Sequence, residues 1–307
     1  MGLNALTQKA GDNSLQIQAP GAVFIQGVTE ERVRTIFKEM NAESHTEPAQ
    51  KIQETTAAIS EELCKLDNGN RIKRSILHHA AEIVTEIDKS ALCALTVFYI
   101  LSYFRPNNLI SFEGLIQLSN FMKKLLEEGL PENPLWVDHL ELLQAVRIIP
   151  LWTPRKLSQY YPACVPGYTS IGIKAGSPQH EQAKKILQDA QLPDTCLLEN
   201  KFLPGYVRIP LPDFYMINNL MYHSVPLTEE QKQACQQVIH LYDTDPSKQE
   251  IVNKNFMDVF DFSPVLKKIH TWWDTIPCSF DATPVGLLLA NLNARRFEPT
   301  IPAYLEE

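Results

Sequence analysis

The longest continuous apolar stretch of the chain runs from Ala91 to Phe104 and reads ALCALTVFYILSYF. Because Thr96, Ser102 and two tyrosine hydroxyls are its only polar groups, a helix here has no solvent face and must be covered all round. Asp88 precedes it as a natural N-cap, and Arg105-Pro106 ends it. The stretch is shorter than the roughly 20 residues of a membrane span. We therefore predict a mainly α fold built around a buried central helix.

The first thirty residues have a different pattern. Two short runs of alternating polarity flank Pro20-Gly21, a pair suited to the centre of a type II turn. The apolar positions of these runs are Leu15, Ile17 and Ala19, then Val23 and Ile25. Two isolated strands are barely stable in water, so the segment needs a partner, either its own domain or a second chain. We favour pairing between chains, because residues 1–10 are polar and leave the segment at a free end.

Helical patterns follow from residue 28 onwards. Two thinly apolar amphipathic helices are expected over 28–66, where they suit a stalk or an oligomer contact. We expect a helical core domain over 67–165 and an α-rich domain with proline-rich loops over 166–307. Five pairs of a capping residue and a proline predict helix starts at Asn133, Thr153, Ser177, Ser263 and Thr283, and Thr228 with Gln231 predicts a capping box.

The C-terminal segment shows the order helix, extended piece, helix. This order is compatible with a winged-helix-like piece. Its basic side chains are Lys267, Lys268, Arg295 and Arg296. Because a reading helix needs more basic character than this, we expect the piece to pack or dock without touching nucleic acid.

Composition narrows the class of protein. The chain carries 28 basic and 36 acidic residues, a formal net charge of −8, which disfavours long-range attraction to nucleic acid or to an anionic membrane. The six cysteines are dispersed without a CxxC pair, so we expect reduced, structural thiols rather than a zinc site. The first ten residues lack the apolar region of a signal peptide. We expect a cytoplasmic protein with no cofactor.

Candidate chemistry is sparse. His78, His79 and Glu82 form an HHxxE run on a predicted helix, but a metal site needs at least one more ligand. No complete catalytic constellation is apparent in the sequence, so we assign no catalytic residue and lean away from an enzyme. Aromatic residues interleaved with prolines are typical of either a peptide or ligand groove or core packing. The groove candidates are Phe202, Tyr206, Phe214 and Tyr215.

Three stretches carry a resemblance to a protein family. They are the opening GDNSLQIQAPGAVFIQGVT, the central ILHHAAEIVTEIDKSALCALTVFYIL and the closing FDATPVGLLLANLN. Together they resemble an uncharacterised bacterial family associated with anti-phage defence, whose members begin with GxNSxxIQAxG and resemble Abi-alpha-like helical proteins. The sequence departs from the family at Pro20 and through Leu192–Pro226. The resemblance implies a defence role and implies no catalytic residue.

Three hypotheses follow. The first is a defence protein of the abortive-infection type that self-associates and acts by binding a phage or host protein. The second is a nuclease or nucleotide hydrolase effector. The third is a DNA-binding regulator that uses the C-terminal segment.

Overall fold

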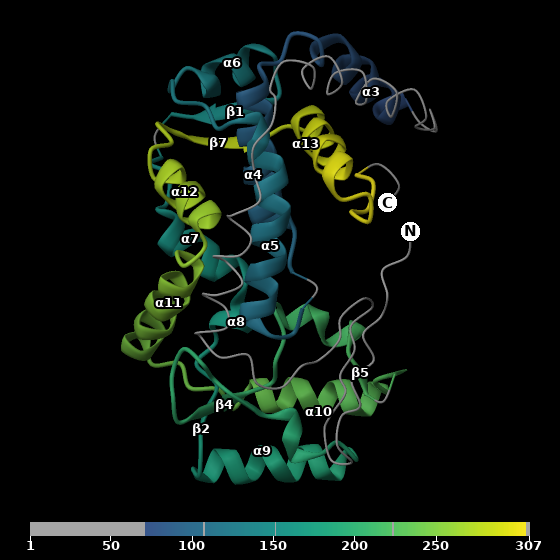
Figure 1. The fold of residues 1–307 in the computed structure, drawn as a ribbon. Coiled ribbons are helices and arrows are strands. Elements are labelled where there is room, and N and C mark those ends of the chain that lie inside the picture. Colours follow the sequence, from purple (N-terminus) through teal and green to yellow (C-terminus); the bar gives the residue numbers. More distant parts are fainter. Residues whose placement is uncertain (1–70, 107, 151, 223, 305–307) are drawn as a thin grey trace. The chain divides into compact units, whose positions relative to one another are not determined.

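The computed structural model describes residues 71–106, 108–150, 152–222 and 224–304, which divide into two units. The smaller unit takes its described residues from Asn107–Gly114 and Val165–Phe256. The described residues of the larger unit come from Val28–Pro106, Leu115–Cys164 and Met257–Glu307. The chain thus leaves the larger unit twice and returns to it. The predicted domains over 67–165 and 166–307 were each continuous in sequence. The mainly α fold class is confirmed (Figure 1).

The larger unit is organised around α4 (Lys89–Tyr103). Asp88 accepts a hydrogen bond from the Ala91 backbone N–H at 3.0 Å, which confirms the predicted cap. Ten of the 15 residues of α4 are buried, and these lie on every side of the helix. The predicted helix without a solvent face is therefore present over most of its length; Tyr103, at its end, is exposed.

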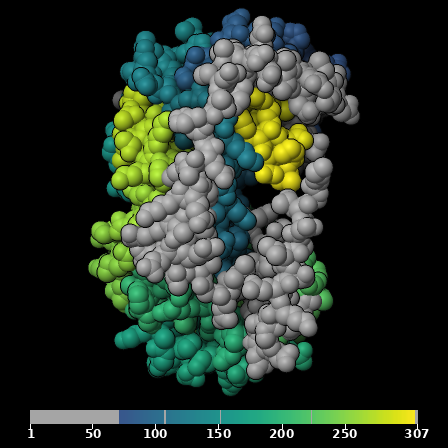
Figure 2. Space-filling model, viewed as in Figure 1, coloured from purple at the N-terminus to yellow at the C-terminus, as the bar shows by residue number. Residues whose placement is uncertain are grey.

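The larger unit also contains α3 (Arg71–Ile83), most of α5 (Ser111–Leu125), η1 (Leu126–Glu128), α6 (Trp136–Leu142), β1 (Val146–Ile149), α7 (Leu157–Cys164), α12 (Pro264–Trp273), β7 (Ser279–Ala282) and α13 (Pro284–Phe297). Of these, α6, α7, η1 and α13 pack against α4, and Phe98 of α4 contacts the rings of Trp273 on α12 and Phe280 on β7. Helix α13 makes the most extensive packing against α4, and it also contacts α3. In Figure 2 the yellow atoms of the C-terminal part of the chain lie beside blue-green atoms from its first half.

Strands β1 and β7 form a two-stranded antiparallel sheet in the larger unit. Val146 pairs with Ala282 and Ile149 pairs with Ser279. The pairing partner of Val146 lies more than 130 residues away in the chain, so no local pattern indicates this strand. Thr283 follows β7 directly, and its hydroxyl donates to the carbonyl of Gln144 at 2.7 Å, so the sheet fixes where α13 begins.

The predicted helix starts have mixed outcomes. Ser177, Ser263 and Thr283 each cap a helix with proline at its first position, and Thr228 forms the predicted capping box with Gln231. Helices α6 and α7 begin two and three residues after Pro134 and Pro154 respectively, so those two pairs precede the helices without capping them. A further start, Asp245-Pro246, was missed: Asp245 accepts a hydrogen bond from the Ser247 N–H at 2.9 Å.

The smaller unit contains a three-stranded antiparallel sheet in the order β2-β4-β3. Its strands are β2 (Ile173–Lys174), β4 (Tyr206–Arg208) and β3 (Leu198–Glu199). Its other elements are α8 (Pro166–Thr169), α9 (Pro178–Asp189), η2 (Asp194–Cys196), η3 (Phe214–Asn219), β5 (Met221–Tyr222), β6 (Val225–Pro226), α10 (Glu229–Ile239) and the first residues of α11 (Pro246–Phe260). Helices α9 and α10 pack against each other, and β5 and β6 form a hairpin.

Buried polar side chains hold the loops of the smaller unit. Asn200 is fully buried, and its amide donates to the carbonyls of Ser170 and Ile171 at 3.0 and 2.9 Å. Arg208 is also buried and donates to the carbonyl of Gly167. The carbonyls of Ser170 and Ile171 belong to the connection between α8 and β2, and that of Gly167 belongs to α8 itself. The two buried side chains therefore satisfy backbone carbonyls that have no sheet partner here. Helix α8 ends at Thr169, and strand β2 contains only Ile173 and Lys174.

Two predicted features lie outside what the structure tests. The N-terminal β segment over 1–27 and the amphipathic helices over 28–66 fall outside the described residues. The winged-helix-like piece stays a prediction. Within the part of the chain that the structure describes, no helix combines the length and apolar character needed to cross a bilayer.

A substitution at Gly286 tests the contact between α13 and Ala145, the residue before β1. A Cβ atom at Gly286 would lie 2.0 Å from the backbone oxygen of Ala145. Gly286→Ala gains about 1 kcal/mol of helix propensity, but it forces two backbones apart at about 3 kcal/mol. We expect a net loss of about 2 kcal/mol in the free energy of unfolding, measured in urea. A variant more stable than the parent contradicts this packing.

Candidate functional site

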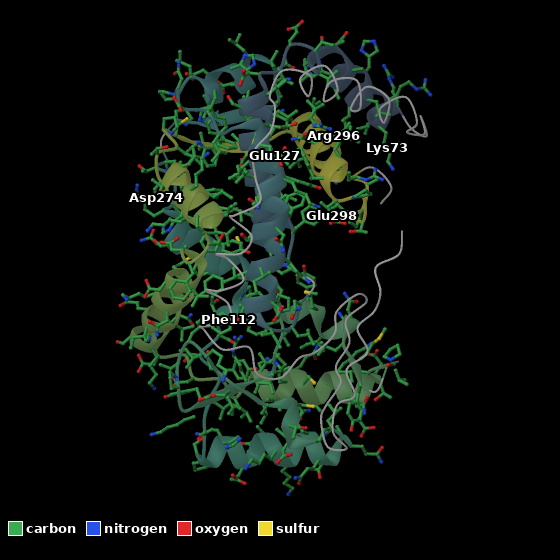
Figure 3. The ribbon with its side chains drawn as sticks, in the orientation of Figure 1. Lys73, Phe112, Glu127, Asp274, Arg296 and Glu298 are labelled. Carbon is green, nitrogen blue, oxygen red and sulfur yellow. The ribbon has the colours of Figure 1, made fainter. Side chains whose placement is uncertain are left out.

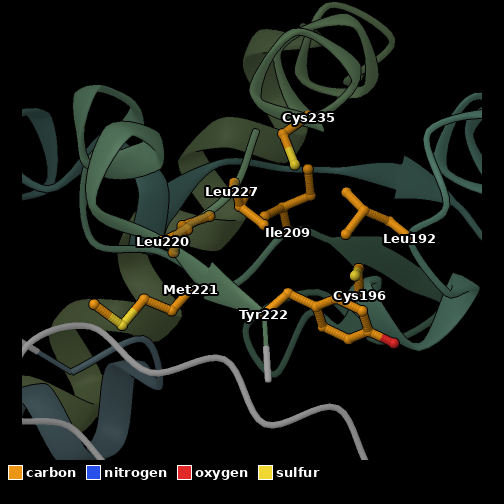
Figure 4. Close-up of a pocket in the computed structure, with 8 residues that line it drawn as sticks. All are labelled: Leu192, Cys196, Ile209, Leu220, Met221, Tyr222, Leu227 and Cys235. Atoms are coloured by element: carbon orange, nitrogen blue, oxygen red, sulfur yellow. The ribbon is translucent and has the colours of Figure 1, made fainter. Parts of the chain in front are cut away.

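An apolar pocket lies in the smaller unit, within and beside the proline-rich segment Leu192–Pro226 (Figure 4). Its lining consists of Leu192, Cys196, Ile209, Leu220, Met221, Tyr222, Leu227 and Cys235. Its cavity volume is about 10 Å³, close to the smallest cavity that holds one water molecule. The pocket is therefore a small apolar depression, and a larger apolar group enters it only if the lining side chains move.

The β5–β6 hairpin forms the mouth of this pocket. Met221 and Tyr222 are half-buried, whereas the other six lining residues are buried. Tyr222 pairs with Val225 across the hairpin, and the side chain of Val225 is 62% exposed. The backbone of Ser224 at the turn has φ +62°, the left-handed conformation that two-residue hairpin loops use. The hairpin thus places an exposed apolar residue opposite a residue of the pocket wall.

Two thiols form part of the wall. Cys196 lies on η2 and Cys235 on α10, and both are free and buried. Burial raises the pKa of Cys196 to about 12, with the nearby Cys235 adding to the rise, and it raises the pKa of Cys235 to about 11. Both are therefore neutral thiols at physiological pH, with the character of small apolar residues. This agrees with the predicted structural role of the cysteines.

The four groove candidates have separate environments. Phe202 is 1% exposed and packs against Phe112 and Phe256, so it is a core residue of the smaller unit. Phe214 stacks edge-on against Tyr242. The Lys248 ammonium lies over the ring of Tyr206. The side chain of Tyr215 is exposed. A common groove formed by these four residues stays a prediction.

The pocket lies beside the aromatic residues for which both a groove and core packing were considered, and none of the four groove candidates lines it. The local signal was available: Met221-Tyr222 and Val225-Pro226 are short apolar runs separated by two residues, as in a β-hairpin. The contribution of Cys235 could not be predicted from the sequence, because α10 reaches the pocket only through tertiary packing. The predicted oligomerisation residues Leu15, Ile17, Ala19, Val23 and Ile25 lie outside the described residues.

The remaining candidates are ion pairs of the larger unit. His78 and His79 each contact the Glu82 carboxylate at 3.3 Å, and no group of three metal-binding His, Cys, Asp or Glu side chains occurs among the described residues. His270 accompanies Asp261 at 2.9 Å, next to the Phe260 ring. These contacts account for the imidazoles as structural pairs.

Arg296, one of the C-terminal basic residues, is engaged within the larger unit. Its guanidinium donates to the Glu128 carboxylate at 2.9 Å, and the side chain is only 18% exposed. Lys267 and Lys268 are exposed. A DNA-binding role for this segment stays untested, with Arg296 already paired to a carboxylate.

No protein-family model, curated protein or solved structure matches this chain. The resemblance to the defence-associated family therefore stays a prediction that depends on its three sequence stretches.

Thiol reactivity tests the environment of the pocket. At pH 8 a thiol with a pKa of about 11 is ionised in roughly one molecule in a thousand. We expect iodoacetamide to modify Cys196 and Cys235 only after unfolding, and to modify the half-buried Cys278 sooner, as measured by peptide mass spectrometry. Labelling of Cys235 as fast as that of Cys278 in the native protein would show an open pocket.

Proposed function

We propose that this protein acts in bacterial anti-phage defence by self-association and by binding a phage or host protein, rather than by catalysis. The observation that carries the binding part is the apolar pocket whose mouth is the β5–β6 hairpin. The resemblance of the three sequence stretches supports the defence part. The alternating pattern of residues 11–26 supports self-association.

The pocket and the hairpin together define the chemistry of the partner. The pocket has an apolar lining, and Val225 offers an exposed apolar surface across the hairpin from Tyr222. Buried apolar anchors surrounded by neutral contacts are the usual centre of a protein interface. An apolar patch on a protein partner therefore suits this surface better than a polar metabolite does.

Truncation tests self-association. A chain that starts at Val28 lacks the alternating segment and its five apolar positions. If strands pair between chains through this segment, the truncated protein falls from a defined oligomer to a monomer, as measured by light scattering after size exclusion. A truncated protein that keeps both the assembly state and the protection against phage contradicts the proposal.

A charge on the hairpin tests partner binding. Val225→Glu places a carboxylate at the pocket mouth, where it opposes apolar docking, and its exposure leaves folding unaffected. The matched control is Ile251→Glu on α11, an equally β-branched side chain that is 47% exposed in the same unit. We expect phage plating to rise by at least about tenfold with Val225→Glu, corresponding to a loss of about 1.4 kcal/mol in binding. The control is expected to protect like the parent.

If both variants protect as well as the parent protein does, the hairpin is not the docking surface. Equal loss by both would show a general effect of added charge instead of a docking surface. Circular dichroism of the two purified variants establishes that each is folded.

A further inference from the structure

The two edges of the β1–β7 sheet differ in their hydrogen bonding. Helix α6 packs against β1, and the Glu141 carboxylate at the end of α6 accepts the Ile148 N–H at 2.9 Å. This N–H therefore points away from β7. Residues that lie opposite each other in an antiparallel pair point their N–H and C=O groups either at each other or both outward. Since Ile148 pairs with Phe280, the backbone groups of Phe280 point outward on the β7 side.

The outer edge of β7 has hydrogen-bonding groups without partners. Thr283, just after the strand, donates its N–H to the Ala145 carbonyl at 3.0 Å, on the β1 side. Because the direction alternates along a strand, Phe280 and Ala282 both direct their N–H and C=O groups outward. No hydrogen bond to these groups occurs among the described residues. Such a row of backbone groups is a template for a further strand.

The other strands that the structure describes are less suited to strand addition. Strand β6 contains Pro226, which has no N–H to donate. Strands β2, β3 and β5 have two residues each. The outer edge of β1 faces α6, which takes up the Ile148 N–H. Strand β7 has four residues, so it offers the longest edge without partners in the described part of the chain.

Both ends of β7 are held in place. The chain enters β7 from α12, which ends at its C-cap residue Asp274, labelled in Figure 3. The Asp274 carboxylate accepts the Leu157 N–H at 2.9 Å. The chain leaves β7 through Thr283, whose hydroxyl accepts the Gly286 N–H at the start of α13. Because the edge is already ordered, an added strand does not have to order β7 as well, and this lowers the entropic cost of binding.

The two faces of the sheet define which sequence can be added. Val146 and Phe280 are buried on one face, whereas Arg147 and Asp281 are exposed on the other. A strand beside β7 continues both faces, so it needs apolar and polar residues in alternation. The run Leu15–Ala19 reads LQIQA, with apolar residues at every second position and glutamines between them. This run therefore matches the sheet in both length and polarity.

We propose that the outer edge of β7 receives the segment of residues 11–26 from a second copy of this chain, which extends the β1–β7 sheet by a third strand. This inference rests on the proposed self-association and names the surface that accepts the segment. In strand addition, main-chain hydrogen bonds supply the affinity and the alternation of side chains sets the register. The segment and the edge are different surfaces of one chain, so the contact builds a ring or a filament, or a dimer that exchanges segments.

Ala282→Pro tests the acceptor edge in the full-length protein. The proline removes an outward N–H and places its ring at the outer edge, while the N–H groups that face β1 remain. The matched control is Ala282→Ser, which changes the same position and keeps the N–H. We expect the parent and Ala282→Ser to form the same oligomer and Ala282→Pro to be a monomer, as measured by light scattering after size exclusion. Circular dichroism establishes that both variants are folded.

The outcomes separate this inference from the proposed self-association. If the parent is an oligomer and a folded Ala282→Pro keeps its mass, the β7 edge is not the acceptor, and the inference is overturned while self-association stands. If the parent is a monomer, both are overturned.

If Ala282→Pro fails to fold, photocrosslinking decides. The photoreactive residue benzoylphenylalanine replaces Asp281, whose side chain is exposed on β7. Isotopically heavy and light chains are mixed and allowed to exchange subunits before irradiation. Mass spectrometry is expected to find crosslinks to residues 11–26 that join a heavy chain to a light chain. Crosslinks confined to one chain, or to any other segment, overturn the proposal.

Discussion

The larger unit depends on the burial of one helix on all its sides. Helix α4 is so apolar that no orientation gives it a stable surface position, and each uncovered Leu or Val side chain would cost about 1.5 to 3 kcal/mol. Neighbouring segments of the chain cannot supply enough cover, because a short loop brings in only one adjacent helix. The cover includes α6 and α7, and it is completed by α13 near the C-terminus. The return of the chain to the larger unit after residue 257 is a consequence of this requirement.

Apolar cover alone does not fix how α13 lies on α4, because apolar surfaces slide past each other at little cost. Two buried asparagines remove this freedom. Asn291 donates to the Tyr99 hydroxyl at 3.0 Å and Asn293 donates to the Thr96 hydroxyl at 3.0 Å. As the numbers rise on α13 they fall on α4, so the two helices run antiparallel. A slip by one turn would break both of these hydrogen bonds to α4, at about 0.5 to 1.5 kcal/mol each.

Local features of the fold were predictable from the sequence, and features that depend on distant partners were not. Capping by Ser177, Ser263 and Thr283 follows from hydrogen bonds within three residues, so the sequence contains the whole cause. The strand character of Val146 depends on Ala282, which no local pattern reveals. The apolar pocket lies within and beside the proline-rich segment, whose aromatic residues were typical of either a groove or core packing. Its wall could not be predicted, because Cys235 approaches only through the packing of α10.

The pairing of Arg296 shows the same limit. In the sequence, Arg296 is part of a basic helix end, which is typical of an exposed side chain. The register set by Asn291 and Asn293 places its guanidinium 2.9 Å from the Glu128 carboxylate, and both side chains are largely covered. Apolar residues of similar volume would hold the helices together at least as well. The pair therefore contributes more to how α13 is positioned than to the stability of the larger unit.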